Sequence, residues 1–280
     1  MIYEIKVGGN GMISFLEDEI SLELEDKTIS KQRCVWKRNV LDEDGEKLKL
    51  SRFVSGKIPY YYRDPSKIAN DFYDKLDTIG LIADICRKTP RTEKFRCSHF
   101  GEILGSIYIE EILGYKILLR KLTQLTAEDT NVHKMDVMCV DTSEKEFKYW
   151  WFEVKTSMRH GKIYHRNGIY KQMKKSLENY ALGDKLYDFV QIRDNLSKSD
   201  FSEDEIRTIR KQLSPPGPKI TFHGMAIINV DTVDDDDGKY LLSEESILNY
   251  NVKILTVSDL KDLAIEAYNR LEAIQKAAEA

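Results

Sequence analysis

The chain has 280 residues, of which 41% are hydrophobic and 32% are charged, and its formal net charge is −4. This length and composition suffice for a buried core and exclude a chain that is disordered throughout. The slight acidic excess argues against a protein that coats nucleic acid through its overall charge. The longest apolar stretches, such as 79–85 and 149–152, are far shorter than the roughly 20 residues needed to cross a bilayer, so we expect no membrane span.

The N-terminus and the cysteines indicate the compartment. Residues 1–6 include an acid and no apolar segment, so we expect no secretory signal. The cysteines at positions 34, 86, 97 and 139 form no C-x-x-C pair and have no histidines at the spacing of a zinc site. This pattern predicts reduced thiols, and neither disulfides nor structural zinc. We therefore expect a cytoplasmic protein.

The N-terminal part of the chain has a pattern of strands and turns. Residues 12–16 and 20–24 have the pattern of strands separated by an acidic turn, and residues 42–45 resemble a loop. We interpret residues 1–62 as a small β-rich module and residues 63–280 as a second domain.

Helical spacing begins after this segment. Asp64 begins a helix-start signal, and the pattern after it predicts a helical pair that ends before Pro90. Ser98 is a candidate N-cap for a further helix, which contains Glu102 and stops near Gly114.

Extended patterns follow Gly114. They predict three successive strands, at 115–122, 135–141 and 147–156. A helical pattern with a break near Gly183 covers 169–212 and ends at a proline-rich loop. The remaining elements are two further strands and a closing helix, which we expect at 220–230, at 252–257 and from Ser258 onward.

The second and third of the three strands form a predicted hairpin that brings two acids together. If Thr142 faces Phe147 across the turn, Asp136 lies directly opposite Glu153. Facing carboxylates repel each other unless a positive charge lies between them. This repulsion should raise the pKa of one of the two carboxyl groups. The prediction depends on this register, because a slip of one residue would move Asp136 to the other face of the sheet.

A lysine completes the predicted cluster. Glu153 and Lys155 are two residues apart, so they project from one face of the strand, whereas Trp150, Phe152 and Val154 project from the other. Two acids and one ammonium group therefore converge. Paired carboxylates suit a hard divalent cation such as magnesium, which prefers oxygen ligands and keeps several waters.

An ordered set of motifs over roughly residues 95–180 resembles the PD-(D/E)xK nuclease superfamily. The set consists of His99-Phe100-Gly101-Glu102 on a helix, His133-Lys134-Met135-Asp136, and the strand Trp150-Trp151-Phe152-Glu153-Val154-Lys155-Thr156. Met135 stands where the motif that names the superfamily has proline. Taken together, the motifs are similar to those of the nuclease subunit of the Hachiman antiphage defence system.

The resemblance implies a fold, an activity and partners. The fold is of the α/β class, with a restriction-endonuclease-like core in which helices flank a mixed β-sheet, here joined to the small β-rich N-terminal module. The activity is magnesium-dependent hydrolysis of DNA phosphodiesters, with manganese as an alternative ion. The implied partners are DNA and a superfamily 2-type helicase subunit of a bacterial defence system.

The same resemblance assigns roles to individual residues. Asp136 and Glu153 would be metal ligands, with the backbone carbonyl of Val154 as a third. Glu102 would bind or position a metal from its helix. Lys155 would orient the attacking water or stabilise charge on the phosphate.

A basic segment follows Lys155 and contains no acid up to position 175. If it contacts DNA phosphates, the residues that bind are Arg159, Lys162, Arg166, Lys171 and Lys174. The alternative is a solvated helix face. Weaker candidates for the site are His99 as a hydrogen-bonding group near Glu102, His133 as a phosphate contact, and Gln172 by analogy with glutamines in some superfamily members.

Three functional hypotheses remain open on the sequence. The first is the nuclease of a two-component defence system, the second is a stand-alone restriction-type or repair endonuclease, and the third is a catalytically silent DNA-binding subunit on the same fold. The sequence has no G-x-x-x-x-G-K-[ST] phosphate-binding loop, so any ATP-driven step must come from a partner. The retained Asp136, Glu153 and Lys155 favour a catalytic protein.

Overall fold

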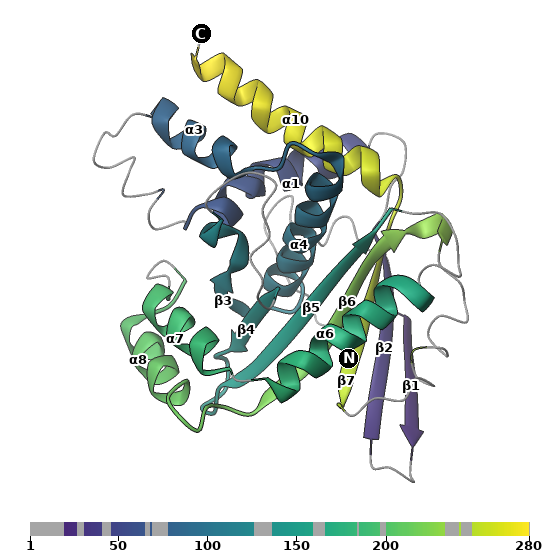
Figure 1. Cartoon of the computed structure of the whole chain (residues 1–280), viewed down its shortest axis with the longest axis vertical. Coiled ribbons are helices and arrows are strands. Elements are labelled where there is room, and N and C mark those ends of the chain that lie inside the picture. The colour runs from purple at the N-terminus through teal and green to yellow at the C-terminus, as the bar shows by residue number, and fades with distance from the viewer. Residues whose placement is uncertain are drawn as a thin grey trace.

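A computed structural model of the chain describes residues 20–26, 31–40, 46–64, 68, 78–125, 136–158, 166–183, 185–196, 200–232, 241 and 248–279. Its centre is a seven-stranded sheet with the order β1-β2-β7-β6-β5-β4-β3 (Figure 1). The strands are β1 (Ile20–Asp26), β2 (Lys31–Val40), β3 (Lys116–Arg120), β4 (Val137–Asp141), β5 (Lys148–Ser157), β6 (Ile220–Asn229) and β7 (Tyr250–Val257).

The sheet is mixed. Strands β3, β4 and β5 pair antiparallel in succession, whereas β5, β6, β7 and β2 pair in parallel and β1 closes the edge antiparallel to β2. Parallel neighbours need long crossover connections, and helices provide them here. This arrangement confirms the α/β class and the mixed sheet flanked by helices.

Two apolar cores lie on opposite faces of the sheet. One core forms beneath the helices α1 (Glu46–Tyr62), α3 (Thr78–Lys88), α4 (Glu93–Glu111) and α10 (Leu260–Glu279). The other forms beneath α6 (Lys171–Leu182), α7 (Leu186–Asn195) and α8 (Glu203–Gln212). Figure 1 shows α6 crossing the face of β5 and β6, with α4 on the far side of the sheet.

Strand β5 divides its side chains between these cores. Phe152 and Val154 belong to the core with α4, and Trp151 belongs to the core with α6. Because successive strand residues alternate in direction, Glu153 and Lys155 project toward the face that α6 covers. The prediction that these two residues share a face, opposite Phe152 and Val154, is confirmed.

Some predicted boundaries differ from the structure. Helix α4 begins at Glu93 with Thr92 as its N-cap, so the prediction of an N-cap at Ser98 is wrong. Ser98 is exposed within the helix, where a serine is tolerated, and the start is instead set by the extended backbone of Thr92. The predicted strand at 12–16 lies outside the residues that the structure describes.

The N-terminal segment also differs from its prediction. It contains two strands at 20–26 and 31–40, but residues 46–62 form helix α1, not β structure. Strand β2 joins the central sheet through β7, and α1 buries Leu50, Val54 and Ile58 in the core beneath α4 and α10. The domain boundary near residue 62 stays a prediction, although the described part of this segment shares the sheet and core of the rest.

Two further predictions concern membrane-spanning helices and the state of the cysteines. None of the helices in the described ranges is long and apolar enough to cross a membrane. Cys86, Cys97 and Cys139 are free thiols, and the side chain of Cys34 lies outside the described residues.

Candidate active site

The hairpin of β4 and β5 has the predicted register. Val137 pairs with Phe152 and Asp141 with Lys148, so the next position in the ladder places Asp136 opposite Glu153. Asp136 and Glu153 are both buried. Asp136 is also fixed to the neighbouring strand, because its Oδ2 accepts a hydrogen bond of 2.9 Å from the backbone N–H of Val154.

Helix α4 contributes the third carboxylate from the opposite side of the sheet. Gly101 lies so close to Thr156 of β5 that only a residue without a side chain fits there. This close approach brings the next residue, Glu102, to the end of the sheet where β4 begins. Glu102 is buried, as expected for a side chain that faces the sheet and not solvent.

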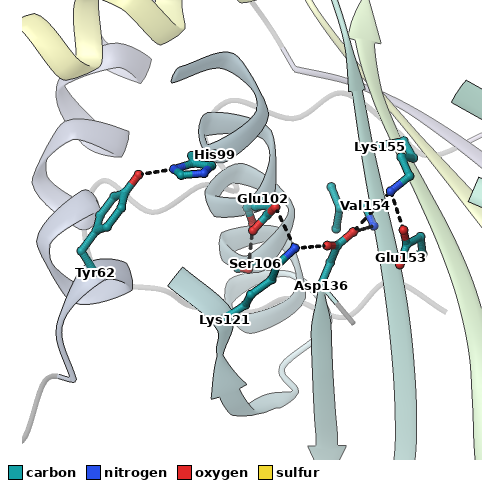
Figure 2. A network of polar contacts seen from close by, with 9 residues as sticks. All are labelled: Tyr62, His99, Glu102, Ser106, Lys121, Asp136, Glu153, Val154 and Lys155. Atoms are coloured by element: carbon teal, nitrogen blue, oxygen red, sulfur yellow. Dashed lines mark hydrogen bonds and ion pairs between the residues drawn. The ribbon is translucent and has the colours of Figure 1, made fainter. Parts of the chain in front are cut away.

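Three acids and two lysines form an alternating row, in the order Glu102, Lys121, Asp136, Lys155 and Glu153 (Figure 2). The Nζ atom of Lys121 lies 2.7 Å from Asp136 Oδ1 and 3.4 Å from Glu102 Oε1. The Nζ atom of Lys155 pairs with Glu153 Oε1 and lies 3.9 Å from Asp136 Oδ2. Each ammonium group therefore separates two carboxylates that would otherwise repel each other.

Lys121 is the residue that sequence reasoning missed. It begins a short 3-10 helix, η2 (Lys121–Gln124), directly after β3. Its place beside Asp136 depends on the antiparallel pairing of β3 with β4, which brings the end of one strand to the start of the other. A basic residue at a strand end is common, so the only available signal was too weak to single it out.

Burial and neighbouring charges shift the pKa values of the row. Burial, and after it the charge of Asp136, raise the pKa of Glu153 to about 7, against the opposing effect of Lys155. Burial likewise raises the pKa of Glu102 to about 7, opposed by Lys121. Burial alone would lower the pKa of Lys121, but the charges of Asp136 and Glu102 raise it overall, so its ammonium form is stabilised. The raised pKa of Glu153 has the direction predicted from the hairpin, although burial, and not the charge of Asp136, is its largest cause.

Comparison with known protein families identifies the chain. Residues 13–271 match the family model of HamA, which spans most of the sequence. The chain belongs to the HamA family. HamA is a component of the Hachiman antiphage defence system, so the family expected from the motifs at 99–102, 133–136 and 150–156 is confirmed. No curated protein matches the chain.

The donor set of this HamA-family site fits a hard divalent cation in its chemistry. Its three acids supply oxygen ligands, and Glu153 Oε2 is buried without a hydrogen bond of normal geometry to any described residue. The Ser176 hydroxyl of α6 is near enough to the same carboxyl group to lower its pKa. Among the described residues, however, no group of three or more acids, cysteines or histidines is already arranged to hold a metal ion. Two lysines lie between the acids of the row. A ligand role for the Val154 carbonyl stays a prediction.

His99 lies in a separate polar cluster. Its Nδ1 is 2.7 Å from the hydroxyl of Tyr62, which is in turn 3.0 Å from the hydroxyl of Tyr268 (Figure 2 shows the first of these contacts). This buried cluster joins α4 to α1 and α10. The structure therefore gives His99 a packing role one helical turn before Glu102, and its predicted functional role stays a prediction.

The basic segment is only partly described. Arg159, Lys162 and His133 lie outside the described residues, and Arg166 is described by its backbone alone, in a π-helical turn at 166–170. Lys171 and Gln172 are exposed in the first turn of α6, and Lys174 is half-buried. Because Ser176 on the same helix faces Glu153, this end of α6 lies next to the row of charged residues.

Proposed function

We propose that this member of the HamA family is a magnesium-dependent DNA nuclease, with the row from Glu102 to Glu153 as its active site. The observation that carries the proposal is the grouping of three buried acids with two partly buried lysines at one place in the fold. Burying ionised groups is costly even when they are paired, and an apolar core would be as stable without them. Carboxyl groups with raised pKa values in such a cluster are typical of functional sites.

Each residue has a chemical role in this proposal. Asp136 and Glu153 hold the metal, with the Val154 carbonyl and Glu102 as further ligands. Bound magnesium supplies charge stabilisation and lowers the pKa of a water molecule. Lys155, held by Glu153 on the same face of β5, orients that water or stabilises charge on the phosphate.

The proposed substrate is based on the basic segment beside the site, and the proposed partner on the lack of an ATP-binding loop in the sequence. The basic residues of segment 155–175, including Lys171 and Lys174 at the start of α6, are the proposed contacts for DNA phosphates. The chain lacks a phosphate-binding loop for ATP, so we assign ATP-driven work to a superfamily 2-type helicase subunit, in a cytoplasmic two-component system. The family assignment supports a defence role, and a helicase gene beside this one would support the partner.

The test is cleavage of supercoiled plasmid DNA with magnesium, with and without the co-expressed helicase. Glu153→Ala and Lys155→Ala should each abolish nicking while the circular dichroism spectrum stays unchanged. Lys148→Ala is the matched control, because Lys148 lies on the same strand but pairs with Glu144 at the exposed end of the hairpin. Cleavage by both site variants at the wild-type rate would overturn the assignment.

The same assay separates the alternatives. A catalytically silent subunit would bind the plasmid and leave it intact in every variant, including the wild type. A stand-alone restriction-type enzyme would cleave at defined sequences without the helicase. The proposed two-component nuclease should instead depend on the co-expressed helicase for its cleavage, and it should lose that cleavage with either site substitution.

A further inference from the structure

Lys121 has no role in the mechanism proposed above, yet it lies inside the site. Its Nζ is 2.7 Å from Asp136 Oδ1 and 3.4 Å from Glu102 Oε1, and only 13% of its side chain is exposed (Figure 2). Lysines are rarely buried to this extent unless they are paired. Lys121 is therefore an integral part of the charge balance in the metal-free protein.

The position of Lys121 conflicts with metal binding by Asp136. One oxygen of Asp136, Oδ2, already accepts the backbone N–H of Val154. The other, Oδ1, accepts from Lys121. An ammonium group and a divalent cation repel each other at such short range, so a metal cannot take Oδ1 while Lys121 holds it.

The backbone at Lys121 is fixed on both sides. Before it, the guanidinium group of Arg120 pairs with Glu110 and Asp200, each at 2.6 Å. After it, Leu122 and Leu125 are buried in the core beneath α4. The flexible four-carbon side chain is therefore the part of Lys121 that can withdraw, and its withdrawal requires no change in the fold.

We propose that Lys121 is a built-in counter-ion that stabilises the metal-free site and competes with the divalent cation for Asp136 and Glu102. The inference rests on the proposed metal-dependent function. Lys121 thereby sets the metal concentration at which the site fills: it lowers the affinity for metal and reduces the repulsion between Asp136 and Glu102 while no metal is bound.

The direct test is the dissociation constant for manganese, measured by isothermal titration calorimetry on the full chain. Lys121→Met keeps an unbranched side chain that is one atom shorter and removes the charge, and it should bind manganese about tenfold more tightly than the wild type. Its melting temperature in EDTA should be lower, because Asp136 and Glu102 no longer share a cation. Lys148→Met is the matched control and should change neither quantity.

A second variant keeps the test decisive if Lys121→Met does not fold. Lys121→Gln retains a hydrogen-bond donor for Asp136 without the charge, and it should also bind manganese more tightly. Unchanged or weaker manganese binding in the folded variants, beside normal binding by the wild type, would overturn the role of Lys121 alone. No manganese binding by the wild type or by any variant would overturn the metal site and the proposed function with it.

Discussion

A Cβ atom added to Gly101 would lie 1.8 Å from Thr156 Oγ1 and 2.8 Å from Thr156 Cβ. Helix α4 therefore approaches strand β5 most closely at the bare backbone of Gly101. The residues next to this contact belong to the proposed active site on both elements, Glu102 on the helix and Lys155 on the strand. The distance between them is set by the absence of a side chain at position 101.

The first prediction concerns this contact. Gly101→Ala should lower the free energy of unfolding by about 2 kcal/mol, because overpacking of a tight interface forces the elements apart. It should also reduce cleavage by displacing Glu102. Gly56→Ala is the control: no atom lies within 4 Å of the added methyl group, and alanine is the better helix former, so stability should stay constant or rise by up to ~1 kcal/mol. Urea denaturation measures the free energy of unfolding of the two variants, and equal values for both would contradict the prediction.

The second prediction concerns Asp136. If Asp136 faced only Glu153, Asp136→Asn would relieve repulsion and stabilise the metal-free protein slightly. Because Lys121 and Lys155 both approach Asp136, we expect the opposite, a decrease in stability of about 3 kcal/mol, since two partly buried ammonium groups would lose the charge of their shared buried partner. Thermal melts in EDTA should show a lower melting temperature, and manganese should no longer raise it. An undiminished manganese shift in the variant would mean that Asp136 is not a ligand.

The third prediction is a pH dependence of stability. The pKa of Glu153 is raised to about 7 in the folded chain, so the folded state holds a proton that the unfolded state releases above pH ~4.5. The metal-free protein should therefore lose stability as pH rises from about 4.5 to about 7, and Glu102 contributes in the same direction. Manganese affinity should rise over the same range, because the metal competes with the proton.

Melting temperatures in EDTA between pH 5 and pH 8 measure this effect. Glu153→Gln removes one titrating group and should flatten the decline. Glu146→Gln, at an exposed position in the hairpin turn, should leave the profile of the wild type unchanged. Identical slopes for Glu153→Gln and the wild type would show that Glu153 does not titrate in this range.

The fourth prediction concerns DNA binding by α6. If Lys171 and Lys174 each neutralise a DNA phosphate, substituting both with alanine should weaken binding and lower the slope of log affinity against log salt by about 1 per lysine removed. Lys145→Ala and Lys211→Ala, at exposed positions on the hairpin turn and α8, form the control pair. Fluorescence anisotropy over a salt series measures the slope, and an unchanged slope would identify this part of α6 as a solvated face.

The hairpin that holds Asp136, Glu153 and Lys155 could be predicted from the sequence because its geometry is local. Side-chain alternation places Glu153 and Lys155 on one face, and a short turn sets the register that puts Asp136 opposite Glu153. The helix with Glu102 could be predicted as an element, but its start was wrong, because capping preferences are weaker than the pattern of burial.

The tertiary structure alone decided that Lys121 and Glu102 meet Asp136. Lys121 reaches Asp136 because β3 pairs with β4, and Glu102 reaches the same place because Gly101 packs on Thr156. The parallel pairing of β2 with β7, which joins the N-terminal strands to the central sheet, links segments about 200 residues apart and leaves no periodic signal in either. The periodicity of side chains and the length of turns act over a few residues, so they determine which side chains share a face and which strand residues pair. Contacts between distant elements depend on how whole surfaces pack, and the information for this packing is spread over the entire chain.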